Sequence, residues 1–343
     1  MKKKVISTLL CVAMATTMLA GCGSKAPAAD TTGAAEEPAT EAEAETEAPA
    51  EETAAAGGKY GVVIKTLSSE FWQTMAKGIE DKAAELGVEV EVLGANSEDD
   101  IEGQVNIFET MISSGEYCAF AVAPLSDSNL VNAVVEANEK GYLVANIDEK
   151  INQDTLAAAG GSLVSFVTTD NAVVGKTAGD YIASLLQSGD EVAIIEGKAG
   201  AASGEDRKQG CTEAFEAAGL KIVDSQPADW DKTKAYDLAT NLINKNADLK
   251  AIYCCNDTMA MGAYQAVSDS GKDIIVVGTD GNSDAIESVK AGGLTATVGQ
   301  DSAQVGARSL ELLVEAYTNG DTPGSKDMID ERIDPVLITK DQN

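Results

Sequence analysis

The sequence predicts an α/β protein with two doubly wound lobes, each built on a parallel sheet. Short apolar strands alternate with amphipathic helices from Lys59 onward, a pattern typical of parallel sheets that are covered on both faces. The pattern yields about ten strands, which is more than one sheet comfortably holds. With 343 residues, the chain is also long enough for two domains of ordinary size.

Residues 1–22 have the features of a secretory signal. Lysines at positions 2–4 precede an apolar stretch over 5–19 that is too short to span a bilayer comfortably. The segment ends in Leu19-Ala20-Gly21-Cys22, which resembles a bacterial lipobox. We therefore expect lipidation of Cys22 and a membrane anchor of two acyl chains. An ordinary cleavable signal with a chance cysteine is the alternative.

Residues 23–58 are predicted to form a disordered acidic tether. The segment is composed mainly of Ala, Glu, Thr and Pro, and residues 26–58 hold nine acidic residues and no basic one. Such a sequence cannot bury enough apolar surface to offset the entropy of ordering. We expect it to space a folded body away from a membrane.

The charge and the absence of histidine exclude several function classes. The formal net charge is −31, which disfavours nucleic acid because phosphate binding needs a basic face. Without histidine, neither a Ser-His-Asp triad nor a His-ligated metal site can form. Cys118, Cys211, Cys254 and Cys255 lack CxxC spacing, so we interpret them as buried apolar residues and expect no metal or cofactor.

The elements follow from the period of the apolar residues. Phe71, Met75 and Ile79 recur at helical spacing, and Gly87 ends that helix. Apolar runs predict strands over 60–65, 88–93, 118–123, 142–147, 164–168, 191–196, 221–225, 251–255, 274–278, 295–299 and 336–338. Helical spacing predicts helices over 71–86, 101–112, 130–140, 173–186, 211–218, 234–244, 259–268, 284–290 and 303–317.

Polar residues gather at the carboxyl ends of these strands, where open parallel sheets bind ligands. They are Lys65, Asp148, Glu149, Asn256, Asp257, Asp280 and Gln300, with Arg207 a short glycine-containing loop beyond another strand. Each alone is an ordinary cap or loop residue, but together they offer carboxylates, amides and cations without a phosphate-loop glycine pattern. That mixture suits a neutral ligand with many hydroxyls, because each hydroxyl both donates and accepts.

The aromatic residues favour the same kind of ligand. Phe71 and Trp72 start a helix just after Lys65, and Trp230 lies in a polar loop. A pyranose packs its C–H faces on aromatic rings while its hydroxyl rim bonds to polar groups. Helix core is the alternative interpretation of Phe71, and loop packing that of Trp230.

With these residues in place, the chain resembles the periplasmic sugar-binding proteins of the ribose-binding type, and within that family the allose-binding branch. The resemblance covers residues 59–300. Its motifs are Lys65–Ser68 with Phe71-Trp72, Ala123–Ser126, Asn146–Lys150, Phe166–Asn171, Val192–Gly200, Ser225–Asp231, Asn256–Gly262, Val277–Gly281 and Thr295–Val298.

The resemblance implies a periplasmic binding protein-like fold, with the two lobes joined by a three-stranded hinge. Crossovers are expected near Thr169, Gln300 and Lys326. The N-terminal lobe would be 59–169 plus 301–326, and the C-terminal lobe 170–300 plus 327–343. The implied sugar-binding residues are Lys65, Ser69, Phe71, Trp72, Asp148, Glu149, Arg207, Trp230, Asn256, Asp280 and Gln300.

The chain departs from the allose-type pattern just before Phe71. That pattern has Asn-Pro where this chain has Ser69-Glu70. The Ser69 side chain is shorter than that of Asn and lacks the amide donors, and Glu70 replaces a proline that fixes the loop. Either change would alter which hexose or pentose fits. Lys65, which would pair with Glu149 or with a sugar hydroxyl, favours the allose-like over the ribose-like pocket.

The expected function is that of a lipid-anchored, extracytoplasmic substrate-binding protein of an ABC sugar importer. It would be a monomer that closes on a D-allose-like or ribose-like monosaccharide and then docks on the membrane subunits of a permease. The alternative is a sugar sensor that presents the closed form to a chemoreceptor or sensor kinase, with the same pocket.

Two further classes are disfavoured. Asp148 and Asp280 resemble a glycosidase acid/base pair, but nearby Lys and Arg are expected to keep both ionised, which leaves no proton donor. We therefore expect no catalytic residue. The related sugar-responsive repressors need a basic helix-turn-helix head, whereas this chain begins with a signal and an acidic tether.

Overall fold

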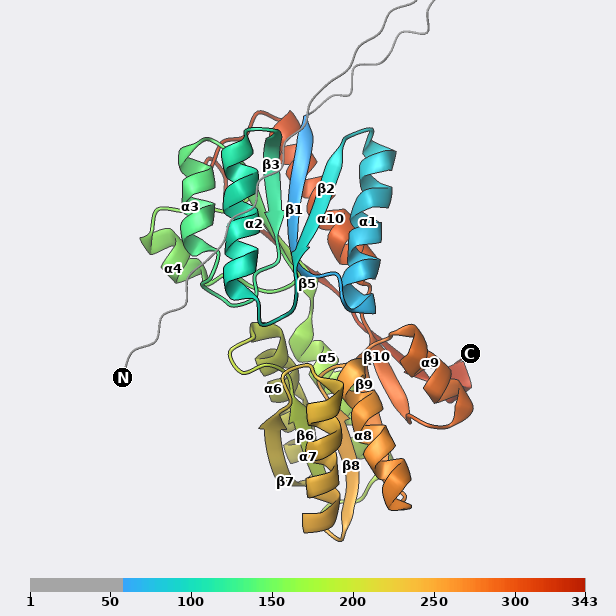
Figure 1. Cartoon of the computed structure of the whole chain (residues 1–343). Helices are drawn as coiled ribbons and strands as arrows, with labels where there is room; N and C mark the ends of the chain where they lie inside the picture. The colour runs from blue at the N-terminus through green and yellow to red at the C-terminus, as the bar shows by residue number, and fades with distance from the viewer. Residues whose placement is uncertain (1–57, 343) are drawn as a thin grey trace, which may run out of the picture. The chain divides into compact units, whose positions relative to one another are not determined.

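A computed structural model describes residues 58–342, which form two six-stranded sheets with helices on both faces (Figure 1). The predicted α/β fold class is thereby confirmed. The signal of 1–22, the lipidation at Cys22 and nearly all of the tether of 23–58 lie outside the described residues.

The first sheet has the order β11-β5-β4-β3-β1-β2, and all of its strands run parallel. The strands are β1 (Lys59–Thr66), β2 (Val90–Ala95), β3 (Tyr117–Val122), β4 (Leu143–Ile147), β5 (Ser165–Thr169) and β11 (Ile329–Ile333). The helices of this first lobe are α1 (Glu70–Leu86), α2 (Ile101–Ser114), α3 (Val131–Glu139), α4 (Gln153–Ala158) and α10 (Ser302–Thr318).

The second sheet has the order β12-β10-β9-β8-β6-β7, and only β12 runs antiparallel to its neighbour. The strands are β6 (Glu191–Glu196), β7 (Lys221–Pro227), β8 (Leu249–Cys254), β9 (Ile275–Asp280), β10 (Ala296–Gly299) and β12 (Val336–Thr339). The helices of this second lobe are α5 (Asn171–Leu185), α6 (Ala202–Ala217), α7 (Lys232–Lys245), α8 (Asp257–Ser270) and α9 (Ser283–Ala291), and Lys340–Gln342 form a 3₁₀ turn.

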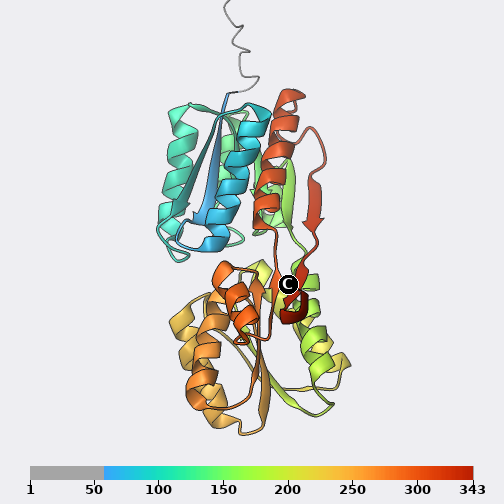
Figure 2. The same ribbon diagram turned by 90° about the vertical axis from the view of Figure 1, so that its right-hand side faces the viewer.

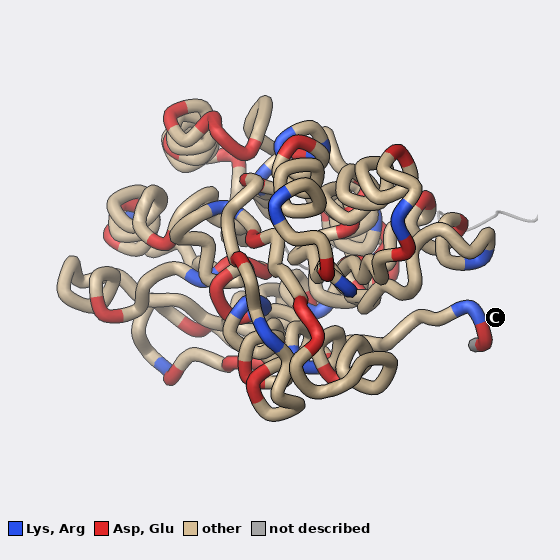
Figure 3. The backbone as a smooth tube through the Cα atoms, turned by 90° about the horizontal axis from the view of Figure 1, so that it is seen from below, with Lys and Arg blue, Asp and Glu red and all other residues tan. Residues whose placement is uncertain are grey.

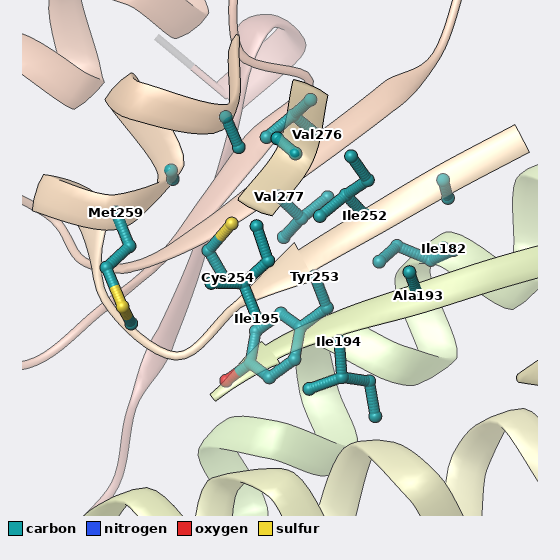
Figure 4. Packing of buried hydrophobic residues seen from close by; sticks show 14 of the residues in the cluster. Ile182, Ala193, Ile194, Ile195, Ile252, Tyr253, Cys254, Met259, Val276 and Val277 are labelled. Atoms are coloured by element: carbon teal, nitrogen blue, oxygen red, sulfur yellow. The ribbon is translucent and has the colours of Figure 1, made fainter. Parts of the chain in front are cut away.

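The second-lobe core shows why unbroken apolar runs became strands. Ile194 and Ile252 lie on neighbouring strands and are fully buried, with Val277 beside them on β9 (Figure 4). A strand with both side-chain rows buried cannot alternate apolar with polar residues. Cys254 and Cys255 belong to this core, and Cys211 is buried with them, as predicted, whereas Cys118 is only partly buried.

The chain crosses between the two sheets three times. It passes from β5 into α5 near Thr169 and from β10 into α10 near Gln300, as expected. The third crossing lies between β11 and β12 rather than near Lys326, because β11 pairs with β5 in the first sheet. The sequence of β11, Ile-Asp-Glu-Arg-Ile, is that of an edge strand with little buried surface. The short helix α4 was also not predicted.

The surface of the described residues carries many acidic side chains with basic ones among them. Asp and Glu are distributed along the chain, interspersed with Lys and Arg (Figure 3). Among residues 58–342, no helix has the length and apolar character needed to cross a membrane, and no cluster of three or more acidic or cysteine side chains is arranged to hold a metal.

Helices α1 and α10 pack side by side on one face of the first sheet (Figures 1 and 2). Gly78 permits this close approach. A Cβ atom on Gly78 would lie 2.3 Å from the backbone oxygen of Ala303 and 2.6 Å from its Cα. Backbone atoms cannot rotate away as a flexible side chain can, so the helices would have to separate.

Replacing Gly78 with Ala should therefore lower the free energy of unfolding by about 1–3 kcal/mol, the usual effect of overpacking a filled interface. Urea denaturation of the purified protein measures it. Thr74→Ala, on the exposed side of α1, is the matched control and should change stability by less than about 0.5 kcal/mol. A Gly78→Ala protein as stable as the control would contradict the account of this helix contact.

Candidate functional site

A pocket of about 400 Å³ lies between the two lobes, at the carboxyl ends of strands from both sheets. It is lined by Lys65, Thr66, Ser68, Ser69, Glu70, Phe71, Trp72, Glu98 and Asp148 from the first lobe. The second lobe contributes Ser203, Arg207, Trp230, Asn256, Thr258, Asp280, Asn282 and Asp284. Nine of the eleven predicted binding residues therefore line one cavity. The other two, Glu149 and Gln300, do not line it but hydrogen bond to Lys65 and Asp280.

Three pocket residues have backbone angles that are unusual for residues with side chains. Asp148 follows β4 with a φ of 58°, Trp230 has a φ of 62°, and Asp280 ends β9 with a φ of 122°. Such conformations are strained and persist only where surrounding contacts impose them. Hydrogen bonds hold Asp148 in place: its N–H donates to Val167 at 2.7 Å, and its carbonyl accepts from the Thr168 hydroxyl at 2.7 Å.

A buried ion pair lies behind the pocket. Lys65 Nζ is 2.9 Å from Glu149 Oε2, and both side chains are almost completely buried. Burial alone would raise the pKa of Glu149, but the charge of Lys65 and hydrogen bonds from Lys65 and Ser203 leave that pKa below its usual value. Burial likewise opposes the charge of Lys65, yet Glu149, Glu98 and Asp148 leave its pKa raised. The predicted pairing of Lys65 with Glu149 is confirmed.

The two pocket aspartates resist ionisation. Burial raises the pKa of Asp148 to about 7, against the opposing charge of Lys65. Burial also raises the pKa of Asp280 to about 6, although Arg207 and Gln300 favour its charged form. Removal from water thus outweighs the nearby positive charges at both carboxylates, and Asp148 departs further than Asp280 from the expected ionised form.

Two buried oxygens at the site have no hydrogen-bond partner: Asp148 Oδ1 and Gln300 Oε1. The amide of Gln300 is oriented by its Nε2, which donates to Asp280 Oδ1 at 2.7 Å. A buried acceptor without a donor is costly, so the Asp148 oxygen, which belongs to a lining residue, favours a ligand that brings a hydroxyl donor.

Arg207 reaches the pocket from α6 and is held rigidly. Its Nε donates to Asn171 at 2.8 Å, one terminal nitrogen donates to the Cys255 carbonyl at 2.8 Å, and the same nitrogen lies 3.6 Å from Asp280 Oδ1. Asn256 caps α8 by accepting from the Met259 N–H at 2.9 Å. The Oδ1 of Asn256 is thus engaged at the cap.

Asp257 holds the loop after β9 in place through hydrogen bonds. This fully buried carboxylate accepts from the N–H groups of Gly281 and Asn282, each at 2.8 Å, and from the Thr297 hydroxyl at 2.7 Å. Burial raises the pKa of Asp257 well above its usual value. Asp257 was noted at a strand end in the sequence, and its contacts make it a support for the loop rather than a lining residue.

The aromatic residues come from opposite lobes. Phe71 and Trp72 form an edge-to-face pair with ring centroids 5.1 Å apart, and Trp72 Nε1 donates to Glu98 at 2.8 Å. Trp230 packs on Gly197, where a Cβ atom would lie 2.0 Å from the indole. The rigid ring therefore needs glycine at that position. The Arg207 guanidinium lies 5.8 Å from the Trp230 ring centre.

Sequence reasoning missed several lining residues. Thr258, Asn282 and Asp284 lie two to four residues beyond Asn256 and Asp280, so extending each strand end by one helical turn would have found them. Glu98 and Ser203 gave no such signal, because one lies in an acidic turn and the other inside a helix. Ser69 and Glu70, which depart from the allose-type pattern, both line the pocket.

Several known proteins are similar to this chain in sequence and fold. Residues 60–321 match the family described as periplasmic binding protein domain. The D-allose-binding periplasmic protein of Escherichia coli (strain K12) is 50% identical over 293 residues, which cover 84% of this chain and 94% of that protein. The ribose import binding protein of Bacillus subtilis (strain 168) is 35% identical over 251 residues, covering 73% and 79% of the two chains.

A solved structure is similar at the level of the whole fold. The ABC transporter periplasmic solute binding protein from Actinobacillus succinogenes 130z, with bound D-allose, superimposes with a TM-score of 0.77 at 30% identity. The match covers 83% of this chain and 98% of that one. Together with the family match over most of the body, these relatives show that the chain belongs to the periplasmic binding protein domain family.

Proposed function

We propose that the protein is the extracytoplasmic, lipid-anchored substrate-binding protein of an ABC sugar importer. It binds a neutral monosaccharide, D-allose-like or ribose-like, between its two lobes and delivers it to the membrane subunits of a permease. The observation that carries the proposal is the single pocket that brings both tryptophans together with carboxylate, amide and guanidinium groups from the two lobes. The relatives named above are binding proteins for allose and ribose, not enzymes.

The pocket chemistry supports a neutral ligand. Its volume of about 400 Å³ is at the small end for ligand sites, which run from about 300 to 1,000 Å³. Among its lining residues, five are acidic (Glu70, Glu98, Asp148, Asp280 and Asp284) and two are basic (Lys65 and Arg207). A phosphorylated or acidic sugar would meet net repulsion there. Sugar hydroxyls, in contrast, can donate to the carboxylates of the pocket and accept from its cations and amides.

Each proposed binding residue has a distinct role. Phe71 and Trp72 contact one face of the sugar ring and Trp230 the other, so the ring is held between the lobes. Asp148, Asp280 and Gln300 accept hydrogen bonds from hydroxyls, with Gln300 also fixing Asp280. Arg207 and Asn256 donate to sugar oxygens. Lys65 and Ser69 contact the sugar from the first-lobe side of the pocket. Glu149 acts indirectly, through its ion pair with Lys65. The protein functions as a monomer.

A sensor that presents its closed form to a receptor would share this pocket. Only the partner distinguishes it from an importer component, so co-purification with permease subunits or with a receptor is the discriminating observation.

Titration with sugars tests the proposed ligand class. We expect D-allose or D-ribose to bind saturably with one site per chain and to change the fluorescence of Trp72 and Trp230, because both indoles line the pocket and a bound sugar changes their surroundings. D-ribose 5-phosphate, the matched anionic sugar, should give no response at the same concentrations. Calorimetry provides the second readout. A folded protein that responds to none of the neutral aldoses would refute the proposal.

Replacing Asp148 with Asn should raise stability and weaken binding. The folded pKa of Asp148 is about 7, above the ordinary value near 4. Between these two pH values the folded state therefore holds a proton that the unfolded state has lost. The charged form therefore destabilises the sugar-free protein above about pH 7, and this penalty disappears as the pH falls toward 4. Asn also tolerates the positive φ.

We expect Asp148→Asn to be more stable at pH 8 by on the order of 4 kcal/mol, with little difference near pH 4. Sugar affinity at pH 8 should fall about tenfold or more, because a charge-assisted hydrogen bond is lost. Urea denaturation across this pH range and calorimetry measure the two effects. The control is Asp273→Asn, at an exposed loop position. A destabilised variant at pH 8 would show that the cost of burying this charge does not govern the stability of the site.

Replacing Cys22 with Ala tests the anchor. We expect the wild-type protein in the membrane fraction and the variant in the soluble fraction or unprocessed, because two acyl chains are needed for stable attachment. The control is Cys11→Ala, within the apolar stretch of the signal, which should stay membrane-bound. Cell fractionation and the mass of the mature N-terminus measure this. A wild-type protein that is fully soluble with an unmodified Cys22 would contradict lipidation.

A further inference from the structure

Three sets of contacts join the two lobes outside the proposed sugar contacts. Glu70, the first residue of α1, accepts from the N–H and the hydroxyl of Ser283 at 3.1 and 2.8 Å. Glu149 accepts from the N–H and the hydroxyl of Ser203 at 3.1 and 2.8 Å. Lys198 Nζ donates to the Glu98 carbonyl and to Asp99 Oδ1, both at 2.7 Å.

The first two of these contacts fall at the beginnings of second-lobe helices. Ser283 is the first residue of α9, and Ser203 is the second residue of α6. The first amides of a helix have no partner within the helix, and a nearby carboxylate satisfies them while opposing the positive end of the helix dipole. Glu70 and Glu149 therefore cap these helices from the other lobe.

The remaining helices of the second lobe cap themselves. Asp170 caps α5, Asp231 caps α7, and Asn256 caps α8, each through a side-chain oxygen that accepts from the N–H three residues later. In contrast, the residue at the cap position of α6 is Ala201, and that of α9 is Asn282, whose side chain makes no cap hydrogen bond. Of the five second-lobe helices, the two without a cap of their own are thus the two that receive a carboxylate across the cleft.

We propose that Glu70 and Glu149 are positioning residues for closure, which hold α9 and α6 against the first lobe independently of the bound sugar. When the lobes separate, water replaces the carboxylates at the N-termini of α6 and α9. The caps therefore stabilise the closed form in the sugar-free protein and slow the release of a bound ligand. This inference rests on the proposed function for its effect on affinity, but not for its effect on the sugar-free protein.

Glu70 and Ser283 provide the sharper test, because Ser283 does not line the pocket whereas Glu70 does. Loss of an N-terminal cap corresponds to about threefold to thirtyfold in an equilibrium constant. We expect Glu70→Ala to weaken sugar binding by a factor in that range, mainly through faster dissociation. Ser283→Ala should weaken it by less, since its N–H still donates. In the Glu70→Ala background, Ser283→Ala should have no further effect.

The coupling between the two residues separates a cap from a direct sugar contact. If Glu70 acted only by touching the sugar, Ser283→Ala would leave affinity unchanged, and this result would overturn the proposal. Equal effects of Ser283→Ala with and without Glu70 would overturn it as well. The matched control is Glu80→Gln on the exposed side of α1, which should leave affinity and dissociation rate unchanged.

Small-angle X-ray scattering of the sugar-free protein tests the caps without any ligand. We expect Glu70→Ala to increase the radius of gyration relative to the wild type and to Glu80→Gln, because a larger fraction of molecules is open. Identical scattering from all three, with unaltered dissociation rates, would refute the proposal. If no sugar binds to any variant but the scattering changes as expected, the proposed ligand is wrong and the capping account stands.

Discussion

The burial of charged side chains at the carboxyl ends of the strands is the constraint on which the site depends. Each charge there must find a partner, because an isolated charge in a low-dielectric environment is costly. Lys65 is matched by Glu149, and Arg207 by Asn171, the Cys255 carbonyl and Asp280. Asp148 is left with one oxygen that has no donor. The protein's own groups thus leave one buried acceptor at the pocket unpaired, and a hydroxyl donor would satisfy it.

The two lobes contribute differently to closure. The first lobe supplies the carboxylates of Glu70 and Glu149, and the second lobe supplies the N-terminal amides of two helices that have no cap of their own. A ligand shifts an equilibrium only by its differential affinity for the two states. Because the caps already favour closure, sugar contacts need to supply only the remaining difference. The deeply buried Glu149 cap and the exposed Glu70 cap differ in how readily water replaces them.

The sequence predicted the fold well because doubly covered strands are continuous apolar runs, and their order along the chain alternates with helices. It failed at β11, where Ile329 and Ile333 flank three charged residues and pairing with β5 decides the structure. The strand-end residues of the site were predictable, since parallel topology brings them to one edge. Glu98 and Ser203 were not, because they reach the pocket only through loop and helix placement. The raised pKa of Asp148 depends on burial, which no local pattern encodes.

A binding protein that delivers its ligand must bind it and also let it go, and the arrangement at this site serves both requirements. Strained backbone at Asp148 and Asp280 and raised carboxylate pKa values make the sugar-free pocket less stable than it would be with uncharged residues. That instability is relieved by a ligand, which favours capture. Two of the three sets of contacts between the lobes are hydrogen bonds from serines at helix ends, and the third joins Lys198 to Glu98 and Asp99. Water can replace each of these hydrogen bonds when the lobes open. Closure is therefore favoured by several modest interactions rather than by one strong one.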